Sequence, residues 1–380
     1  MKVVAILDSF KGSISSLEAG MAVSNGVMRV YPDAEVAVLP LADGGEGTAD
    51  ALIYACKGER ITARVTGPLG DTVDASYGIL PQNVAVIEMS AAAGITLIDS
   101  SLRDPMKTTT YGVGELILDA IGRGCRDFLI GIGGSATNDG GVGMLQALGF
   151  SFLDSKGQPI VRGAAGLSSL SSIDVSRASP VLQECRFRVA CDVTNPLCGE
   201  LGCSAVYGPQ KGATPLAVAK MDACLARYAA LTQAILPHAD GNAPGAGAAG
   251  GMGFALSSYL GAELTSGVSL VLDAMNAAGV ISKADVVVTG EGRLDGQSAM
   301  GKAPVGVARL SKRYGKPVIA LAGSLAEDVS ACHTLGIDAC FSILQGVVPL
   351  ERAMEPSVAK ANLEKTAEEA FRLIQAARRI

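Results

Sequence analysis

The sequence predicts two dissimilar α/β domains, a parallel-sheet Rossmann-like domain and an inserted mixed-sheet domain. The first reason is a repeated order of apolar run, polar glycine loop and amphipathic helix near the N-terminus, which is typical of βαβ units. The second is a stretch between about residues 60 and 90, where Gly-Pro, Gly-Asp and Pro-Gln pairs divide short apolar or alternating runs, as in hairpins. The third is the return of strand-loop-helix order in the last third of the chain. At 380 residues the chain is also too long for a typical single core.

These patterns give a discontinuous domain organisation. We expect residues 1–60 plus 265–380 to form the parallel-sheet domain and residues 61–264 to form the inserted mixed α/β domain, with the active site in a cleft between them. A simple division into an N-terminal and a C-terminal half is the alternative.

The N-terminal elements have the clearest signals. Residues 3–7 are continuously apolar, as expected of a strand buried on both faces. Ser15 and Glu18 have the spacing of a capping box, which predicts a helix beginning there. A second strand is expected at 35–41 and a second helix at 49–55.

The remaining elements follow from the same periodicities. Further strands are expected at 60–65, 73–80, 84–89, 128–132, 186–191, 285–288, 317–321 and 341–344. Further helices are expected at 112–123, 142–148, 220–236, 252–260, 304–314 and 357–378.

Composition narrows the class of protein. Hydrophobic residues make up 49% of the chain and charged residues 18%, which is ample for a large buried sheet. The net charge of −6 and the aromatic content of 4% disfavour a nucleic-acid or anionic-membrane partner. The N-terminal apolar run is too short for a signal peptide, so we expect a cytoplasmic enzyme or binding protein. Nine scattered cysteines and two histidines make a metal-thiolate site improbable and suggest reduced, buried thiols.

Seven glycine-flanked segments carry most of the polar chemistry, and several directly follow an expected strand, where α/β proteins build their sites. They are 8–13 (DSFKGS), 43–48 (DGGEGT), 131–141 (GIGGSATNDGG), 191–195 (CDVTN), 208–213 (GPQKGA), 247–253 (GAAGGMG) and 289–295 (TGEGRLD).

The first segments suggest sites for an anion and a metal ion. Lys11, Ser13 and the N-terminus of the following helix would make an anion seat, although the polar side chains could also serve only the turn. Asp43 and Glu46 offer carboxylate oxygens on a flexible turn, which suits Mg²⁺. Two solvated turn acids are the simpler alternative.

Segment 131–141 matches a dinucleotide-binding fingerprint only at Gly131-Ile132-Gly133, because position 136 is Ala. No acidic residue lies where a nucleotide ribose would require one. Ser135, with Thr137, Asn138 and Asp139, favours phosphate binding over NAD binding, with a structural turn as the alternative.

Segment 296–303 differs from the Walker A pattern at Ala303, where the pattern has Ser or Thr. We also expect it to lie too far beyond the strand at 285–288, so we reject a P-loop. Lys302 either contacts phosphate or is an ordinary surface lysine. Asp192 either accepts a proton from an attacking hydroxyl or caps a turn before Pro196. Lys211 and Arg293 are candidates for a substrate carboxylate or a transferring phosphate.

The motifs DSFKGS, LADGGEGT, IGGSATNDGG, ACDVTNPLCG, GPQKGA and TGEGRLD, in this order, resemble those of the bacterial type I glycerate kinases from Met1 to about Phe371. The resemblance implies two dissimilar α/β domains around a cleft, and phosphorylation of D-glycerate by ATP with Mg²⁺, generally to 2-phosphoglycerate.

Combining the resemblance with the motifs gives an expected set of site residues. Those expected to act in catalysis are Asp192, Lys11 and Asp139. Those expected to bind the nucleotide are Ser13, Gly133, Gly134, Ser135 and Lys302. Those expected to bind glycerate are Asn195, Lys211 and Arg293, and those expected to bind Mg²⁺ are Asp43, Glu46 and Glu291.

Other functions remain as alternatives to a glycerate 2-kinase. A glycerate 3-kinase would share the same motifs. An NAD-dependent hydroxyacid dehydrogenase would fit the parallel strands and glycine loops, but the complete fingerprint, the ribose acid and a histidine placed by a motif are lacking. A non-catalytic sugar-acid sensor would not need the dense set of carboxylates. The pattern does not predict an oligomeric state, since no heptad seam or apolar stripe is evident.

Overall fold

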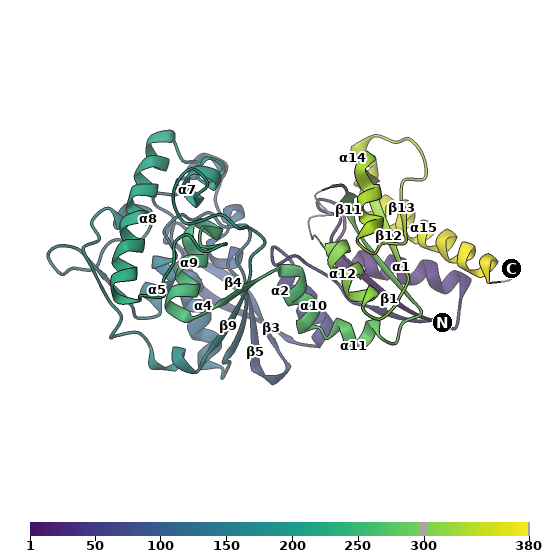
Figure 1. Ribbon diagram of the computed structural model, residues 1–380, viewed down its shortest axis with the longest axis horizontal. Helices are drawn as coiled ribbons and strands as arrows, with labels where there is room; N and C mark the ends of the chain where they lie inside the picture. Colours follow the sequence, from purple (N-terminus) through teal and green to yellow (C-terminus); the bar gives the residue numbers. More distant parts are fainter. Residues whose placement is uncertain (297–302, 379–380) are drawn as a thin grey trace. The chain divides into compact units, whose positions relative to one another are not determined.

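The computed structural model describes residues 1–296 and 303–378. The chain forms two compact units, which are discontinuous in sequence (Figure 1). We call Met1–Asp43, Asp50–Cys56 and Val271–Ile380 the terminal unit, and Gly44–Ala49 and Lys57–Leu270 the central unit. Each is described below by itself.

The terminal unit contains a five-stranded sheet in the order β13-β12-β11-β1-β2, and all of its neighbouring strands are parallel. The strands are β1 (Lys2–Leu7), β2 (Glu35–Val38), β11 (Val286–Leu294), β12 (Val318–Leu325) and β13 (Ala339–Ser342). Residues 3–7 of β1 are at most 2% exposed, because this strand lies inside the sheet and is covered on both faces.

The order of these strands creates a topological switch point. From β1 the chain continues to β2 on one side, whereas from β11 it continues to β12 on the other side. The loops that leave adjacent strands β1 and β11 therefore diverge, and such a crevice is the usual ligand site of an open parallel sheet.

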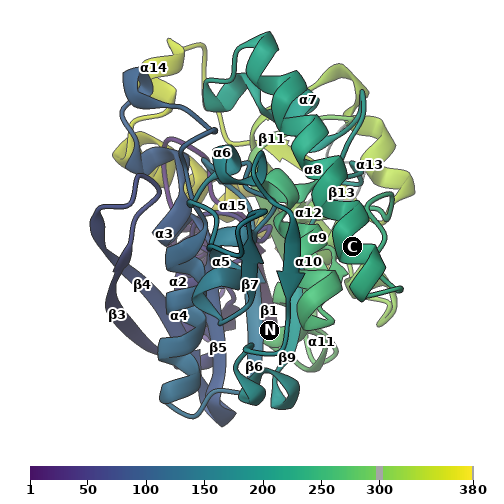
Figure 2. The ribbon, with the colours of Figure 1, turned by 90° about the vertical axis from the view of Figure 1, so that its left-hand side faces the viewer.

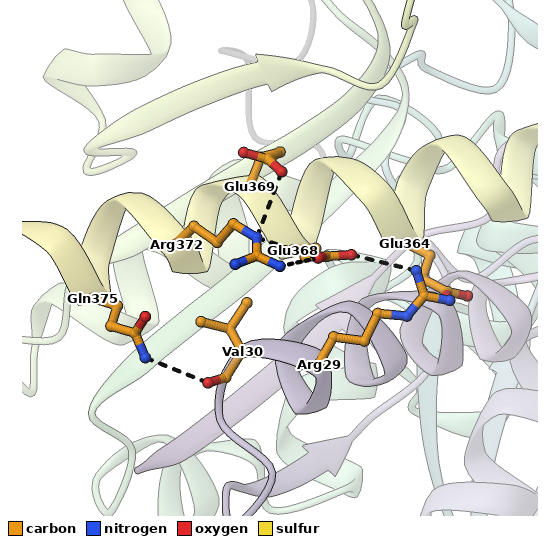
Figure 3. A network of polar contacts seen from close by, with 7 residues as sticks. All are labelled: Arg29, Val30, Glu364, Glu368, Glu369, Arg372 and Gln375. Atoms are coloured by element: carbon orange, nitrogen blue, oxygen red, sulfur yellow. Dashed lines mark hydrogen bonds and ion pairs between the residues drawn. The ribbon is translucent and has the colours of Figure 1, made fainter.

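Helices α1 (Ser16–Val30) and α15 (Pro356–Ala377) pack against each other in this unit. Ser15 and Glu18 form the expected capping box at the start of α1. A Cβ on Gly26 would lie 2.2 Å from the carbonyl oxygen of Glu364, so only glycine permits this close approach of the helices. Figure 3 shows the ion-pair network that borders the contact, in which Arg29 pairs with Glu364 and Glu368, and Arg372 pairs with Glu368 and Glu369.

Shorter helices complete the terminal unit and its connections. They are α2 (Thr48–Cys56), α10 (Gly267–Ala274), α11 (Ala277–Ile281), α12 (Ala303–Lys312), α13 (Ala331–Thr334) and α14 (Leu350–Ala353).

The central unit is built on a six-stranded mixed sheet in the order β10-β9-β6-β5-β4-β3. The antiparallel part comprises β3 (Glu59–Thr66), β4 (Thr72–Leu80) and β5 (Val84–Glu88), and the parallel part continues through β6 (Asp127–Gly131), β9 (Arg186–Ala190) and β10 (Glu263–Thr265). Two short antiparallel strands, β7 (Ser151–Leu153) and β8 (Ser172–Asp174), pair separately.

The helices of this unit are α3 (Ser90–Ala93), α4 (Tyr111–Gly122), α5 (Val142–Ala147), α6 (Ala164–Leu167), α7 (Cys203–Tyr207), α8 (Pro215–Ile235) and α9 (Ala248–Leu260). Helix α4 packs on the β3-β4-β5 part of the sheet and contacts α5 (Figure 2). The core includes Phe128 and Phe187, stacked with their ring centroids 4.9 Å apart on neighbouring strands.

The predicted fold class is confirmed, with a parallel sheet from the chain ends and a mixed sheet from the middle. Several boundaries were wrong. Helix α8 begins at Pro215 rather than at 220, because the Thr214 side chain caps it by accepting from the N–H of Ala217. Strand β11 extends to Leu294, so the segment compared with Walker A follows its strand closely, and only Ala303 still argues against that motif. The short strands β7, β8 and β10 were missed.

All nine cysteines are free thiols, but only Cys125, Cys203 and Cys332 are buried as expected, and the other six are partly exposed. Among the described residues no helix is long and apolar enough to cross a membrane.

Candidate functional site

In the terminal unit, the loop after β1 and the end of β11 lie side by side. The N–H of Asp8 donates to the carbonyl of Gly290 at 2.9 Å, and beyond this point β11 pairs with β12. Glu291 and Arg293 therefore stand beside the 8–13 loop. The two segments, which are far apart in sequence, line one cavity of about 550 Å³.

We call this cavity the switch-point pocket. Its charged and hydroxyl-bearing lining residues are Asp8, Ser9, Lys11, Ser13, Asp43, Glu291, Arg293, Asp295 and Ser324. Its larger apolar lining residues are Phe10, Ile343, Leu344, Leu350 and Met354. Of the predicted residues, the structure thus brings Lys11, Ser13, Asp43, Glu291 and Arg293 together in this pocket, while Lys302 lies outside the described residues.

Asp8 is a buried acid of the pocket. It is 7% exposed, and burial raises its pKa to about 6, with the negative charge of Asp43 adding to the rise and the N–H of Ser9, 2.7 Å from the carboxylate, opposing it. Asp8 lies within the motif DSFKGS, but no role was predicted for it from the sequence. Its position immediately after a fully apolar strand was the signal that could have identified it.

Lys11 is an accessible cation of the pocket. Its side chain is 77% exposed, and its Nζ lies 3.5 Å from a carboxylate oxygen of Asp43. The negative charge of Asp43 raises the pKa of Lys11, so the ammonium is fully charged at neutral pH. An ion pair this exposed contributes at most about 1 kcal/mol, and Lys11 can therefore turn to a ligand at little cost.

The donor set of the pocket fits a nucleotide phosphate with a magnesium ion. The Ser13 hydroxyl is buried and has no hydrogen-bond partner among the described residues, as expected of a group that awaits a ligand oxygen. Asp8, Asp43 and Glu291 supply carboxylates. Within 1–296 and 303–378 no three acidic, His or Cys side chains form a ready metal cage. Mg²⁺ needs only one or two protein carboxylates and takes its other ligands from phosphate and water.

In the central unit, the 131–141 loop follows β6 and holds a buried polar cluster. Lys211 is 3% exposed, and its Nζ donates to the Ser135 hydroxyl at 2.8 Å and to the carbonyl of Thr137 at 2.6 Å. Burial lowers the pKa of Lys211 to about 8, while the negative charge of Asp139 opposes the shift. Gly133 and Gly134 are exposed at the start of the same loop.

The rest of this loop is fixed by internal hydrogen bonds. The Asn138 amide donates to the Ser204 hydroxyl at 2.8 Å, and the N–H of Gly140 donates to the carbonyl of Gly250 at 2.9 Å. Segment 247–253, which was expected to bind a ligand, thus packs against the 131–141 loop and supports it. The buried atoms Thr137 Oγ1 and Asn138 Oδ1 have no hydrogen-bond partner in the described part of the chain.

Asp139, expected to act in catalysis, is only 1% exposed. Its carboxylate accepts from the N–H of Thr110 at 2.9 Å, from the Thr110 hydroxyl at 3.0 Å, and from the N–H groups of Gly141 and Gly143 at 3.1 and 3.3 Å. Burial raises its pKa, and these hydrogen bonds oppose the rise. This arrangement anchors the start of α5 to the segment before α4.

Asp192 and Asn195 follow β9. Asp192 is exposed, and one of its carboxylate oxygens accepts from the N–H of Gly267 at 3.1 Å. The side chain of Asn195 donates to the carbonyl of Leu201 at 2.8 Å and accepts from the Tyr207 hydroxyl at 2.7 Å, so it shapes the loop that carries Asp192.

Glu46 is exposed on the 44–49 segment of the central unit. This segment packs at the ends of β6 and β9, because the Cβ of Ala190 and the backbone of Gly131 lie close to Gly44. The predicted metal set is therefore divided, with Asp43 and Glu291 in the terminal unit and Glu46 in the central unit.

Comparison with known proteins decides the family. The model of the "Glycerate kinase family" matches residues 3–375. The chain belongs to the glycerate kinase family. It is a kinase, a phosphotransferase, and membership implies the use of ATP. The resemblance found in the motifs is confirmed.

Relatives of this family member cover nearly its whole length. It is 49% identical over 355 residues to a protein named glycerate 2-kinase from Escherichia coli (strain K12), with 93% of each chain covered. It is 47% identical over 375 residues to a glycerate kinase from Haemophilus influenzae, covering 98% of this chain and 99% of the relative. The crystal structure of a putative glycerate kinase 2 from Salmonella typhimurium LT2 matches with a TM-score of 0.92 and 46% identity, and 100% of each chain is covered.

Proposed function

We propose that this protein transfers the γ-phosphoryl group of ATP to the 2-hydroxyl of D-glycerate, giving 2-phosphoglycerate and ADP. Family membership supplies the reaction class, and the name of the Escherichia coli relative supports the 2-hydroxyl. The observation that carries the proposal is the switch-point pocket, where an accessible lysine, a buried hydroxyl without a partner and several carboxylates line one cavity. This set suits a polyphosphate with its metal ion.

The switch-point pocket is assigned to the nucleotide. The phosphate oxygens are bound by Lys11, Ser13 and Arg293. Lys302, which lies outside the described residues, remains a candidate for a further phosphate contact. Asp8, Asp43 and Glu291 would hold Mg²⁺, which supplies neutralisation of phosphate charge when bound. Glu46 belongs to the other unit, and we leave it out of the direct ligands.

Asp192 is assigned as the general base. The O–H bond of the glycerate 2-hydroxyl breaks, and its proton passes to the Asp192 carboxylate. A bond forms between this oxygen and the γ-phosphorus while the bond to the β,γ-bridging oxygen breaks, and ADP leaves with that electron pair. Proton acceptance by a positioned carboxylate contributes about 10²–10⁴-fold to rates of this kind. The exposure of Asp192 at the end of β9 supports this role.

The buried polar cluster of the central unit is assigned to positioning the reacting groups and to binding glycerate. The exposed N–H groups of Gly133 and Gly134 and the Ser135 hydroxyl are donors for oxyanions of the reacting groups. Lys211 fixes Ser135 through its 2.8 Å hydrogen bond and adds positive charge for the substrate carboxylate. Asp139 and Asn195 act through the loops that they hold together, because their side-chain atoms are already hydrogen-bonded within the protein.

The test is an assay with Mg-ATP and D-glycerate, in which the product is identified by proton-coupled phosphorus NMR. A single methine coupling shows phosphate on C2 and supports the proposal. A methylene coupling shows phosphate on C3, which keeps the kinase but requires the substrate to bind in the reverse orientation. Absence of glycerate-dependent ADP would overturn the proposal.

A further inference from the structure

The switch-point pocket has an apolar wall that the chemistry of phosphoryl transfer does not explain. Ile343 and Leu344 directly follow β13, and Leu350 and Met354 come from α14 and the residue that follows it. We call these four residues the apolar wall. Leu344, Leu350 and Met354 are 41%, 69% and 36% exposed. Single exposed apolar residues are ordinary, but several that line one cavity indicate a ligand surface.

The apolar wall adjoins the phosphate-binding loop. A Cβ added to Gly12 would lie 2.9 Å from the terminal methyl group of Met354, so this side chain contacts the loop that carries Lys11 and Ser13. The same cavity is therefore apolar at one part of its lining and charged at the adjacent part.

This division matches a nucleoside triphosphate, which joins a flat, weakly polar base to a polyanionic chain. Glycerate has no comparable apolar face. The cavity volume of about 550 Å³ lies in the usual range for small-molecule sites, roughly 300–1,000 Å³. Leucine and methionine side chains adapt readily to the face of a planar ring.

We propose that the apolar wall binds the nucleobase of ATP, with the triphosphate directed toward Lys11 and Ser13. The inference rests on the proposed function, because it assigns the nucleotide of that reaction to this pocket. It adds the residues that distinguish a nucleotide from inorganic polyphosphate.

The experiment compares two probes, Mg-ATP and magnesium tripolyphosphate, which lacks a base. Their dissociation constants are measured by calorimetry for the wild type, Leu350→Ser, Met354→Gln and the double variant. Leu373→Ser is the matched control, since Leu373 is 62% exposed on α15 and does not line the pocket. Circular dichroism checks that each variant is folded. If Met354→Gln is not folded, Leu350→Ser alone still tests the proposal, because Leu350 is well exposed.

We expect the double variant to bind Mg-ATP roughly 10-fold more weakly, since apolar contact with the base is lost. Tripolyphosphate affinity and the KM for D-glycerate should stay unchanged, and Leu373→Ser should behave as the wild type. Unchanged ATP affinity in the double variant, or equal losses for both probes, would overturn the assignment. A wild type that binds ATP without phosphorylating glycerate would instead refute the proposed function and leave the apolar wall testable by binding.

Discussion

Two lysines that each directly precede a glycine have opposite surroundings in the two units. Lys11 precedes Gly12 and Lys211 precedes Gly212, and both glycines have positive φ angles, 76° and 95°. The Lys11 side chain is 77% exposed beside Asp43, whereas Lys211 is 3% exposed and donates to Ser135 and Thr137. The short motif therefore predicts a turn with a lysine, but the burial around it decides what the lysine does.

The difference in exposure separates a lysine that can bind a ligand from a lysine that positions a loop of the protein. An exposed lysine in a weak ion pair is available to an incoming phosphate. A buried lysine whose hydrogen bonds are made to a neighbouring loop of the protein is already committed, and its removal disturbs the protein before it disturbs a ligand. The terminal unit thus presents charges to a ligand, and the central unit uses its polar groups to hold loops in place.

The largest expected effect is on the chemical step, at the exposed carboxylate of the central unit. Asp192→Asn should lower kcat by about 10²–10⁴-fold, because the amide cannot accept the proton of the 2-hydroxyl. Its affinity for ATP, measured by calorimetry, should not change. The matched control is Asp74→Asn, an exposed acid on β4 in the same unit. Near-wild-type turnover of Asp192→Asn would remove this residue from the mechanism.

The two lysines should affect stability with opposite dependence on pH. Because burial lowers the pKa of Lys211 to about 8, the folded state binds fewer protons than the unfolded state between that value and the ordinary 10.5. Relative to Lys211→Met, the free energy of unfolding of the wild type should rise by about 1–3 kcal/mol over this interval.

Lys11 supplies the control, because Asp43 raises its pKa above 10.5. Relative to Lys11→Met, its contribution to stability should be present below this pH and disappear as the pH rises through the folded-state value. Urea unfolding at about pH 7.5, 9 and 10.5 should show the rise for Lys211, while the difference for Lys11 should stay constant over this range. Parallel pH profiles for the two variants would contradict the contrast drawn between the lysines.

Asp8 should show a conflict between stability and activity. Burial raises its pKa to about 6, so the folded state binds more protons than the unfolded state between the ordinary value of 3.8 and that value. The free energy of unfolding should therefore fall as the pH rises through this interval. Asp8→Asn, measured without nucleotide or metal at neutral pH, should be more stable by about 1–3 kcal/mol and much less active. Asp33→Asn, at an exposed turn of the same unit, is the control. A destabilised Asp8→Asn protein would show that the carboxylate is needed for the fold.

The smallest expected effect concerns the N-cap of α1, Ser15, which lies outside the pocket lining. Ser15→Ala removes the acceptor for the N–H of Glu18 and should lower the free energy of unfolding by about 0.5–2 kcal/mol. Ser16→Ala, one position into α1, should change it much less. Equal losses in both variants would mean that the capping box contributes little to the terminal unit.

Much of the fold could be predicted because its signals are local. The uninterrupted apolar run of β1, the capping box of α1 and the hairpin pattern of β3 to β5 each lie within a short window. The glycine-flanked loops were recognisable for the same reason. Strand β10 has only three residues and could not be predicted, because its pairing with β9 comes from tertiary packing.

The site was less predictable, because the same residue types serve different purposes. Asp139 and Asp192 both follow strands in polar loops, yet one is buried under four donor groups and the other is exposed. Leu344, Leu350 and Met354 belong to no motif and become a surface only when β13 and α14 meet the loop after β1. No pattern along the chain reports such an assembly.

The central claim is that the terminal unit binds the nucleotide and the buried cluster of the central unit positions reacting groups. The most direct test is calorimetric titration of Lys11→Met and Lys211→Met with Mg-ATP, alongside the wild type. Lys11→Met should bind ATP about 10-fold or more weakly, because it loses a charge-assisted hydrogen bond. Lys211→Met should keep wild-type ATP affinity and lose turnover. Loss of ATP affinity in Lys211→Met with wild-type affinity in Lys11→Met would contradict the account.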